Sequence, residues 1–144
     1  MSAAIEDRLA ITDLLHRCAG ALDASDWAGL EALFTSDAEA DFGAFGGVRQ
    51  GSREIARFCA RALGRFDVVQ HIIGNVLVRA DGTSACSSCS VLAVHVSQSL
   101  PAPFTVGGVY EDSLRRAEDA RWRIARRVLV IRWCNGAPEG LRAS

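Results

Sequence analysis

Two kinds of secondary-structure pattern occupy separate parts of this chain, and their separation limits the possible folds. Up to about residue 66, apolar side chains recur at the three- and four-residue spacings of amphipathic helices, whereas residues 67–133 carry long β-type runs. Helices first and strands afterwards favour an α+β fold over an alternating βαβ arrangement. The 144 residues are predicted to form one domain, 1–144.

Three helices are predicted in the first part. The first covers residues 3–24, and its apolar face comprises Ile11, Leu15, Cys18 and Leu22. A second, capped by Ser25 or Asp26, is expected to continue to Phe34 and to be followed by an extended segment. A third opens at Ser52 and reaches Phe66, with arginines every four residues on a solvated face.

The strands from residue 67 onward contain a hairpin signal at Asp81-Gly82. If these two residues form the turn, His71 pairs with Leu92 and Asn75 pairs with Ser88. The face of His71 then also carries Asn75, Ser88 and Ser90 among apolar neighbours, as in a small-molecule pocket. His95 has the opposite parity in this register and is predicted to point away from that face.

Composition excludes several functions. The net charge is −1 and no basic stripe is present, so we expect no nucleic-acid partner. No apolar run approaches the ~20 residues of a membrane span, and we expect a cytoplasmic protein without membrane contact. All 16 basic residues are arginine, which rules out a Schiff-base lysine.

Cys86 and Cys89 have the spacing of a metal or redox motif. They lie in a predicted strand, where a separation of three puts the two thiols on opposite faces. We therefore expect packing cysteines and no metal, although a zinc or redox protein built on this pair remains an alternative.

Asp23, His71 and Arg132 are the main candidates for chemistry. Asp23 comes at the carboxyl end of a helix, where the dipole disfavours negative charge, so it is either a solvated rim carboxylate or one with a partner in a pocket. His71 is either a core histidine bonded to a carbonyl or a general base. Arg132 is a substrate contact or half of a structural salt bridge.

Three motifs carry a resemblance to a known family over nearly the whole chain: Leu22-Asp23 through Asp26-Trp27, Gln70-His71 through Gly74, and Trp122 through the closing Ile131-Arg132-Trp133. Together they resemble the SnoaL-like branch of the nuclear transport factor 2-like superfamily, which includes scytalone dehydratase, lindane dehydrochlorinase and polyketide cyclases. The resemblance implies a cone-shaped α+β barrel, with three N-terminal helices packed in a strongly curved mixed or antiparallel sheet.

The resemblance also implies that Asp23 orients and charge-stabilises His71, which abstracts a proton from carbon. Scytalone dehydratase has a second histidine on the adjacent strand and two tyrosines; the comparable positions here are expected to be Ser88, Leu22 and Phe42. The polyketide cyclases are similar in needing only one acid/base residue and an apolar pocket. The resemblance implies no cofactor, and it implies that the protein forms a homodimer or another homo-oligomer.

The sequence thus predicts a cofactor-independent dehydratase, isomerase or cyclase that acts on a small apolar, aromatic or polyketide-like metabolite. His71 and Asp23 are the predicted catalytic residues. The predicted substrate contacts are Phe42, Phe45, Asn75, Ser88, Tyr110, Arg132 and Trp133. The alternative is a non-catalytic ligand-binding or subunit protein of the same fold.

Overall fold

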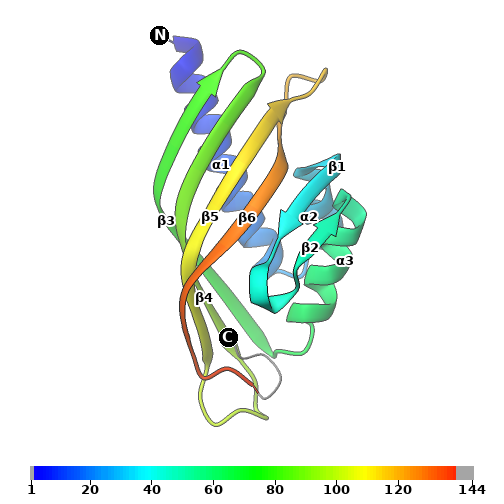
Figure 1. Ribbon diagram of the computed structural model, residues 1–144, viewed down its shortest axis with the longest axis vertical. Coiled ribbons are helices and arrows are strands. Elements are labelled where there is room, and N and C mark those ends of the chain that lie inside the picture. The colour runs from blue at the N-terminus through cyan, green and yellow to red at the C-terminus, as the bar shows by residue number, and fades with distance from the viewer. Residues whose placement is uncertain (1, 139–144) are drawn as a thin grey trace.

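A computed structural model describes residues 2–138 (Figure 1). The helices are α1 (Ser2–Asp23), α2 (Trp27–Ala32), α3 (Ser52–Leu63) and a 3-10 turn, η1 (Gly43–Phe45). The strands are β1 (Phe34–Asp41), β2 (Val48–Gln50), β3 (Val68–Asp81), β4 (Ser84–Val96), β5 (Phe104–Arg116) and β6 (Trp122–Asn135). The predicted order of three helices and long C-terminal strands is confirmed.

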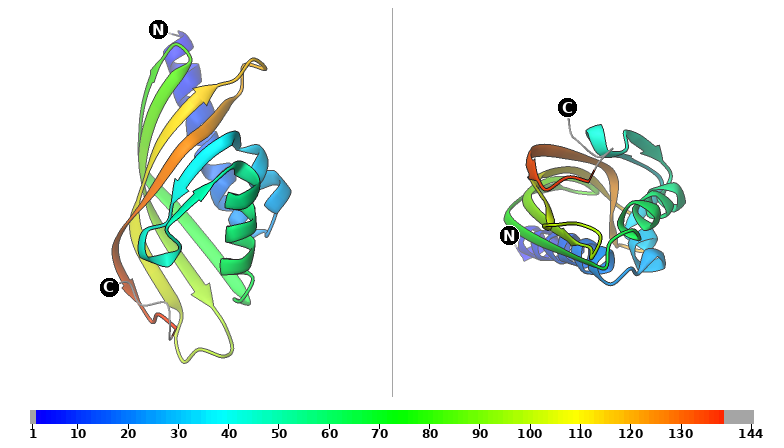
Figure 2. Two further views of the ribbon diagram at one scale, coloured as in Figure 1. Left: turned by 45° about the vertical axis from the view of Figure 1, so that its right-hand side comes forward. Right: turned by 90° about the horizontal axis from the view of Figure 1, so that it is seen from below.

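The strands form one mixed, open sheet in the order β2-β1-β6-β5-β4-β3. Its pairings are antiparallel except for the parallel contact of β1 with β6. The sheet bends around the helices, and α1 runs along its concave side (Figures 1 and 2). This arrangement confirms the predicted α+β class with helices packed inside a curved sheet, although the sheet does not close.

The core lies between the concave face and the helices. It combines the apolar stripe of α1 with the buried face of α3 and alternate residues of the strands, including Ile11, Leu15, Ile55, Leu114 and Ile124, each at most 2% exposed. Burying five such side chains contributes about 1.5–3 kcal/mol each relative to exposure. The amphipathic patterns predicted from the sequence therefore meet in one core.

Two helix ends differ from the prediction. α2 ends at Ala32 and not at Phe34, because Phe34 already begins β1. Phe34 pairs with Ile124 of β6, and this buried pairing outweighs the weak helical pattern of a six-residue segment. α3 ends at Leu63, before Phe66, although it does begin at Ser52 as predicted.

The predicted register of the β3–β4 hairpin is wrong. Asp81 pairs with Ser84, so the turn consists of Gly82 and Thr83. Gly82 has φ +62° and stands first in the turn, where a type II′ hairpin requires glycine.

A bulge then shifts the pairing again. Between the Gly74–Ser90 and Leu77–Ser88 pairs, β3 has one residue more than β4. Asn75 adopts φ +51° there, a left-handed conformation that asparagine tolerates better than most residues. Beyond the bulge His71 pairs with Ala93 and not with Leu92, so odd-numbered residues of β4 share its face.

Candidate active site

A cavity of about 120 Å³ lies between the concave face of the sheet and the helices. Its walls are mainly aliphatic and aromatic, and the aromatic rings come from Phe42, Phe45, Phe58, Phe66 and Phe104. Three side chains bring polar atoms to this lining: His71 from β3, His95 from β4 and Tyr110 from β5. An apolar cavity with a few convergent polar groups is the usual form of a small-molecule site.

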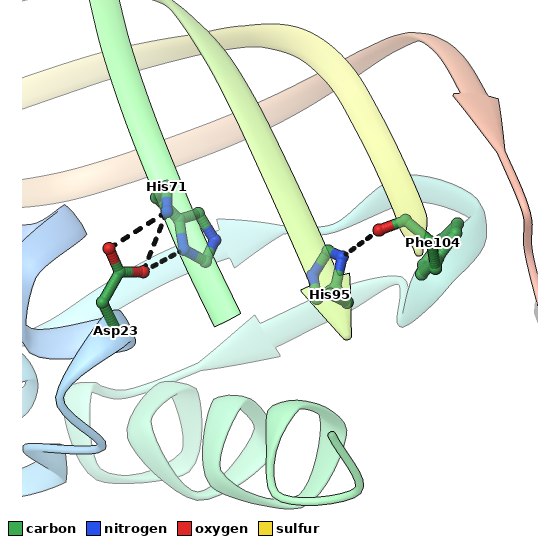
Figure 3. Close-up of polar contacts among 4 residues, drawn as sticks. All are labelled: Asp23, His71, His95 and Phe104. Carbon is green, nitrogen blue, oxygen red and sulfur yellow. Dashed lines mark hydrogen bonds and ion pairs between the residues drawn. The ribbon is translucent and has the colours of Figure 1, made fainter. Parts of the chain in front are cut away.

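Asp23 and His71 are in direct contact (Figure 3). The distance from His71 Nδ1 to Asp23 Oδ1 is 2.7 Å, and the two carboxylate oxygens also accept the backbone N–H of His71 at 2.9 and 3.0 Å. These bonds stabilise a carboxylate at the unfavourable end of α1. The partner that the position of Asp23 requires is thus the residue 48 positions later.

This contact sets the protonation of the imidazole. Asp23 accepts from Nδ1–H, so the unprotonated nitrogen of neutral His71 is Nε2. Burial lowers the pKa of His71 below its ordinary value, and the carboxylate of Asp23 offsets that effect only in part. At neutral pH the ring is therefore an uncharged base whose conjugate acid has a carboxylate beside it.

His95 is a second histidine in the cavity, on the strand next to His71. The two ring centroids are 6.1 Å apart with nearly perpendicular planes. His95 Nδ1 lies 2.8 Å from the carbonyl oxygen of Phe104, and since that oxygen can only accept, Nδ1 carries the proton (Figure 3). Burial lowers the pKa of His95 as well. Both imidazoles are thus neutral, with Nε2 as the free acceptor.

A buried ion pair lies behind the wall of the cavity. Arg127 Nε and Nη2 donate to the two carboxylate oxygens of Asp112 at 2.9 and 2.8 Å, and both side chains are at most 4% exposed. The guanidinium carbon of Arg127 lies 3.9 Å from the ring centroid of Tyr110. The bidentate geometry satisfies two charges that would otherwise be costly to bury.

The SnoaL-like domain model matches residues 3–128, which is most of the chain. The protein belongs to the SnoaL-like family. An uncharacterized protein of Mycobacterium tuberculosis is 37% identical to this SnoaL-like protein over 128 residues, which cover 88% of this chain and 86% of the relative. An uncharacterized protein of Mycobacterium bovis matches to the same extent.

Solved structures share the fold of this SnoaL-like protein. A candidate scytalone dehydratase of Novosphingobium aromaticivorans superposes with a TM-score of 0.84 at 22% identity and covers 97% of both chains. LinA superposes with a TM-score of 0.81 at 17% identity, covering 97% of this chain and 95% of the other. ActVI-ORFA of Streptomyces coelicolor gives 0.73 at 19% identity, over 86% of this chain and 96% of its own. These likenesses show a nuclear transport factor 2-like fold.

The predicted site residues of the SnoaL-like protein divide into two groups. The structure brings together Asp23 and His71, and it places Phe42, Phe45 and Tyr110 around the same cavity. The other four predicted contacts lie outside that cavity, on the outer side of the sheet: Asn75, Ser88, Arg132 and Trp133.

The register explains the second group. Asn75 is exposed within the bulge and donates to Ser90 Oγ at 3.2 Å. Ser88 alternates with buried Cys89, so it faces outward. The residue of β4 that brings an imidazole to the cavity is His95. Trp133 is 51% exposed and pairs with Gly107 on the outer face.

The prediction that faced His95 away from the site is therefore wrong. The signal that could have found it is the Gly74-Asn75 pair inside a strand, which is typical of a bulge.

The two strand cysteines lie on opposite faces of β4, as predicted. Cys86 is exposed and Cys89 is buried. Within residues 2–138, no group of three or more His, Cys, Asp or Glu side chains is arranged to hold a metal ion. No helix in the described part of the chain is long and apolar enough to cross a membrane.

Proposed function

We propose that this protein is a cofactor-independent acid/base enzyme that abstracts a proton from carbon in a small apolar or aromatic metabolite. The observation that carries the proposal is the 2.7 Å contact between Asp23 and His71 at the wall of an apolar cavity. His71 is the general base, and Asp23 is a positioning residue that fixes the tautomer and stabilises the imidazolium.

The reaction begins at Nε2 of His71. This nitrogen takes a proton from a carbon of the bound substrate, and the electron pair of the C–H bond moves into the substrate. The carboxylate of Asp23 compensates the charge that develops on the ring. Depending on the substrate, the anion then expels a leaving group, is reprotonated elsewhere or closes a ring, which covers dehydratase, isomerase and cyclase chemistry.

His95 provides a second acceptor for a proton or a hydrogen bond of the substrate. Its Nδ1–H is held by the carbonyl of Phe104, so its Nε2 is the nitrogen available to a ligand. The two ring centroids are 6.1 Å apart, so the imidazoles contact different atoms of a substrate that is bound beside both of them. His95 Nε2 can therefore accept a hydrogen bond or a proton from a substrate hydroxyl, whereas the imidazolium of His71 is the group that returns a proton to the leaving group or to carbon.

A non-catalytic ligand-binding protein is the competing function. It requires the cavity but not the alignment of the dyad, because a merely apolar site gains nothing from a carboxylate held against an imidazole. The short contact of Asp23 with His71 in an open apolar cavity favours the enzyme.

Deuterium exchange tests the proposal directly. Single-ring enones and phenolic ketones are incubated with the protein in heavy water, and incorporation at carbon is followed by NMR. The wild type is expected to exchange at least one of them faster than buffer does, and His71→Gln is expected to lose about 100-fold of that rate. The matched control is His16→Gln, because His16 is exposed on α1. Equal exchange by wild type and His71→Gln would refute the assignment.

The proposal includes a homo-oligomer in the cytoplasm. Support for self-association comes from the outer face of the sheet, where apolar side chains cluster in an exposed patch: Val68, Ile72, Leu92, Val96 and Trp133. Contiguous exposed apolar surface of this kind marks an interaction site more often than free surface. We propose that a second copy of the chain covers it.

A further inference from the structure

We propose that Tyr110 is a hydrogen-bond donor to an oxyanion of the substrate, and that the substrate is a single-ring ketone. The proposal rests on the proposed function and deepens it, because His71 supplies the base and Tyr110 supplies the electrophile.

The first observation is an unpartnered hydroxyl. Tyr110 is 7% exposed, yet its phenol oxygen takes part in none of the side-chain hydrogen bonds found within residues 2–138. The same oxygen is not among the fully buried polar atoms that lack a partner, so it keeps some exposed surface. Because Tyr110 lines the cavity, we infer that its hydroxyl opens onto the cavity. A buried tyrosine hydroxyl normally has a partner, because leaving a buried polar group unsatisfied is costly. Here the partner is expected to be the ligand.

The second observation is the cation beneath the ring. The guanidinium carbon of Arg127 is 3.9 Å from the ring centroid of Tyr110 and is held in place by Asp112. A cation against an aromatic face withdraws electron density from the ring, which strengthens the O–H group as a donor. Burial nevertheless raises the pKa of Tyr110 far above its ordinary value, so the hydroxyl keeps its proton and can donate it in a hydrogen bond.

The third observation is the size and position of the site. The cavity of about 120 Å³ is slightly smaller than the ~150 Å³ engineered cavity that holds benzene. Tyr110 lies on β5, two strands away from His71 on β3. His71 pairs with Ala93 of β4, which pairs with Val106 of β5, and Tyr110 is four residues further along β5. The two groups therefore reach a ligand from different sides. A single ring whose oxygen is remote from its acidic C–H bond fits between them.

The proposed step balances without any further reagent. His71 Nε2 removes a proton from a carbon conjugated to the substrate carbonyl, and the C–H electron pair forms a new C=C bond. The C=O bond becomes a C–O⁻ bond, and the Tyr110 O–H donates a hydrogen bond to that oxygen. The proton on His71 returns to another atom of the substrate, which leaves the enzyme unchanged.

Two ring probes of the same shape test the proposal. para-Nitrophenolate carries the oxyanion, and para-nitrotoluene has a methyl group in its place; both affinities are measured by equilibrium dialysis at a pH where the phenol is ionised. Tyr110→Phe is expected to weaken binding of the phenolate by about 10-fold or more, as for a lost hydrogen bond to a charged group, and to leave nitrotoluene binding unchanged. Its melting temperature should be equal to or above that of the wild type, because the deleted hydroxyl has no protein partner.

His71→Gln separates this proposal from the proposed function. That variant should lose deuterium exchange yet keep the preference for phenolate over nitrotoluene. The Tyr110 proposal is wrong if Tyr110→Phe weakens both probes equally or weakens neither. It is also wrong if the wild type binds neither probe, or if Tyr110→Phe unfolds several degrees earlier.

Discussion

Replacing Asp23 with asparagine tests the dyad with little change in shape. In the wild type the carboxylate accepts three hydrogen bonds from His71: one from Nδ1–H at 2.7 Å and two, shared between its oxygens, from the backbone N–H. Asparagine carries no charge, and the NH2 group that replaces one of the two oxygens can only donate, so it favours the tautomer with unprotonated Nδ1 when it faces the ring. The variant therefore loses the charge compensation and weakens control of the tautomer.

The magnitude follows from the loss of that charge-assisted bond. Hydrogen bonds to a charged group contribute about 1.5–3 kcal/mol, and tenfold in rate corresponds to about 1.36 kcal/mol. The charge alone thus accounts for roughly 10- to 150-fold in turnover. In the variant, part of the imidazole also carries its proton on Nε2, and that tautomer cannot act as the base. The two effects together bring the expected loss of turnover to at least about 100-fold.

The assay is the pH profile of deuterium exchange together with NMR titration of the imidazole. Asp23 raises the pKa of His71 against the larger effect of burial, so Asp23→Asn should lower that pKa further. The acid limb of the exchange profile should then move to lower pH while the plateau falls. An undiminished plateau, or an acid limb that moves to higher pH, would refute the assigned role of Asp23. Urea unfolding of the variant checks that the fold is retained.

Three further predictions concern stability and assembly. The pKa values of His71 and His95 are lowered from 6.5 in the folded protein, so the unfolded chain binds protons first as the pH falls. The free energy of unfolding should therefore decrease below about pH 6.5, by at most about 2.7 kcal/mol per pH unit for the two groups together. Urea midpoints between pH 8 and pH 5 measure this decrease. Arg127→Met leaves Asp112 buried without its partner and should cost about 3–5 kcal/mol in urea unfolding, against at most about 1 kcal/mol for Arg126→Gln in the exposed pair with Glu39. Trp133→Arg puts a charge in the exposed apolar patch and should shift the protein toward monomer in analytical ultracentrifugation, whereas a monomeric wild type would contradict the proposed assembly.

Local patterns were sufficient for the parts of the fold that depend on period alone. The stripe of α1 and the long β runs each have one favourable way to bury their apolar side chains, so the helix and strand positions follow from the sequence. The contact of Asp23 with His71 required more, because nothing local joins residues 48 apart. The carboxylate at the end of a helix signalled a missing partner, and the family resemblance indicated which one.

The polar lining of the cavity could not be predicted from the strand pattern. Face assignment along a hairpin depends on register, and a shift of one residue exchanges the two faces. The turn at Gly82-Thr83 shifted the register by two residues and so kept the faces, whereas the one-residue bulge at Asn75 exchanged them, which moved Ser88 outward and brought His95 inside. Tyr110 was predicted only as one of seven substrate contacts, because the missing hydrogen-bond partner of its hydroxyl is a property of the packed core.

The bulge at Asn75 also determines which face of the sheet His71 occupies. On the turn side of the bulge the even-numbered residues of β3 point inward, and on the other side the odd-numbered ones do, His71 among them. Deleting Asn75 removes the extra residue, so His71 either turns away from Asp23 or pulls the rest of β3 out of register. Deuterium exchange and the lowered pKa of His71 should both be lost.

Point substitutions at the same position separate the bulge from the asparagine side chain. Asn75→Gly keeps the left-handed residue and should retain exchange, whereas Asn75→Val should cost about 1–2 kcal/mol because a branched side chain opposes φ +51°. If the deletion variant exchanges as fast as Asn75→Gly, the bulge does not place the base, and His71 owes its position to the contact with Asp23 alone.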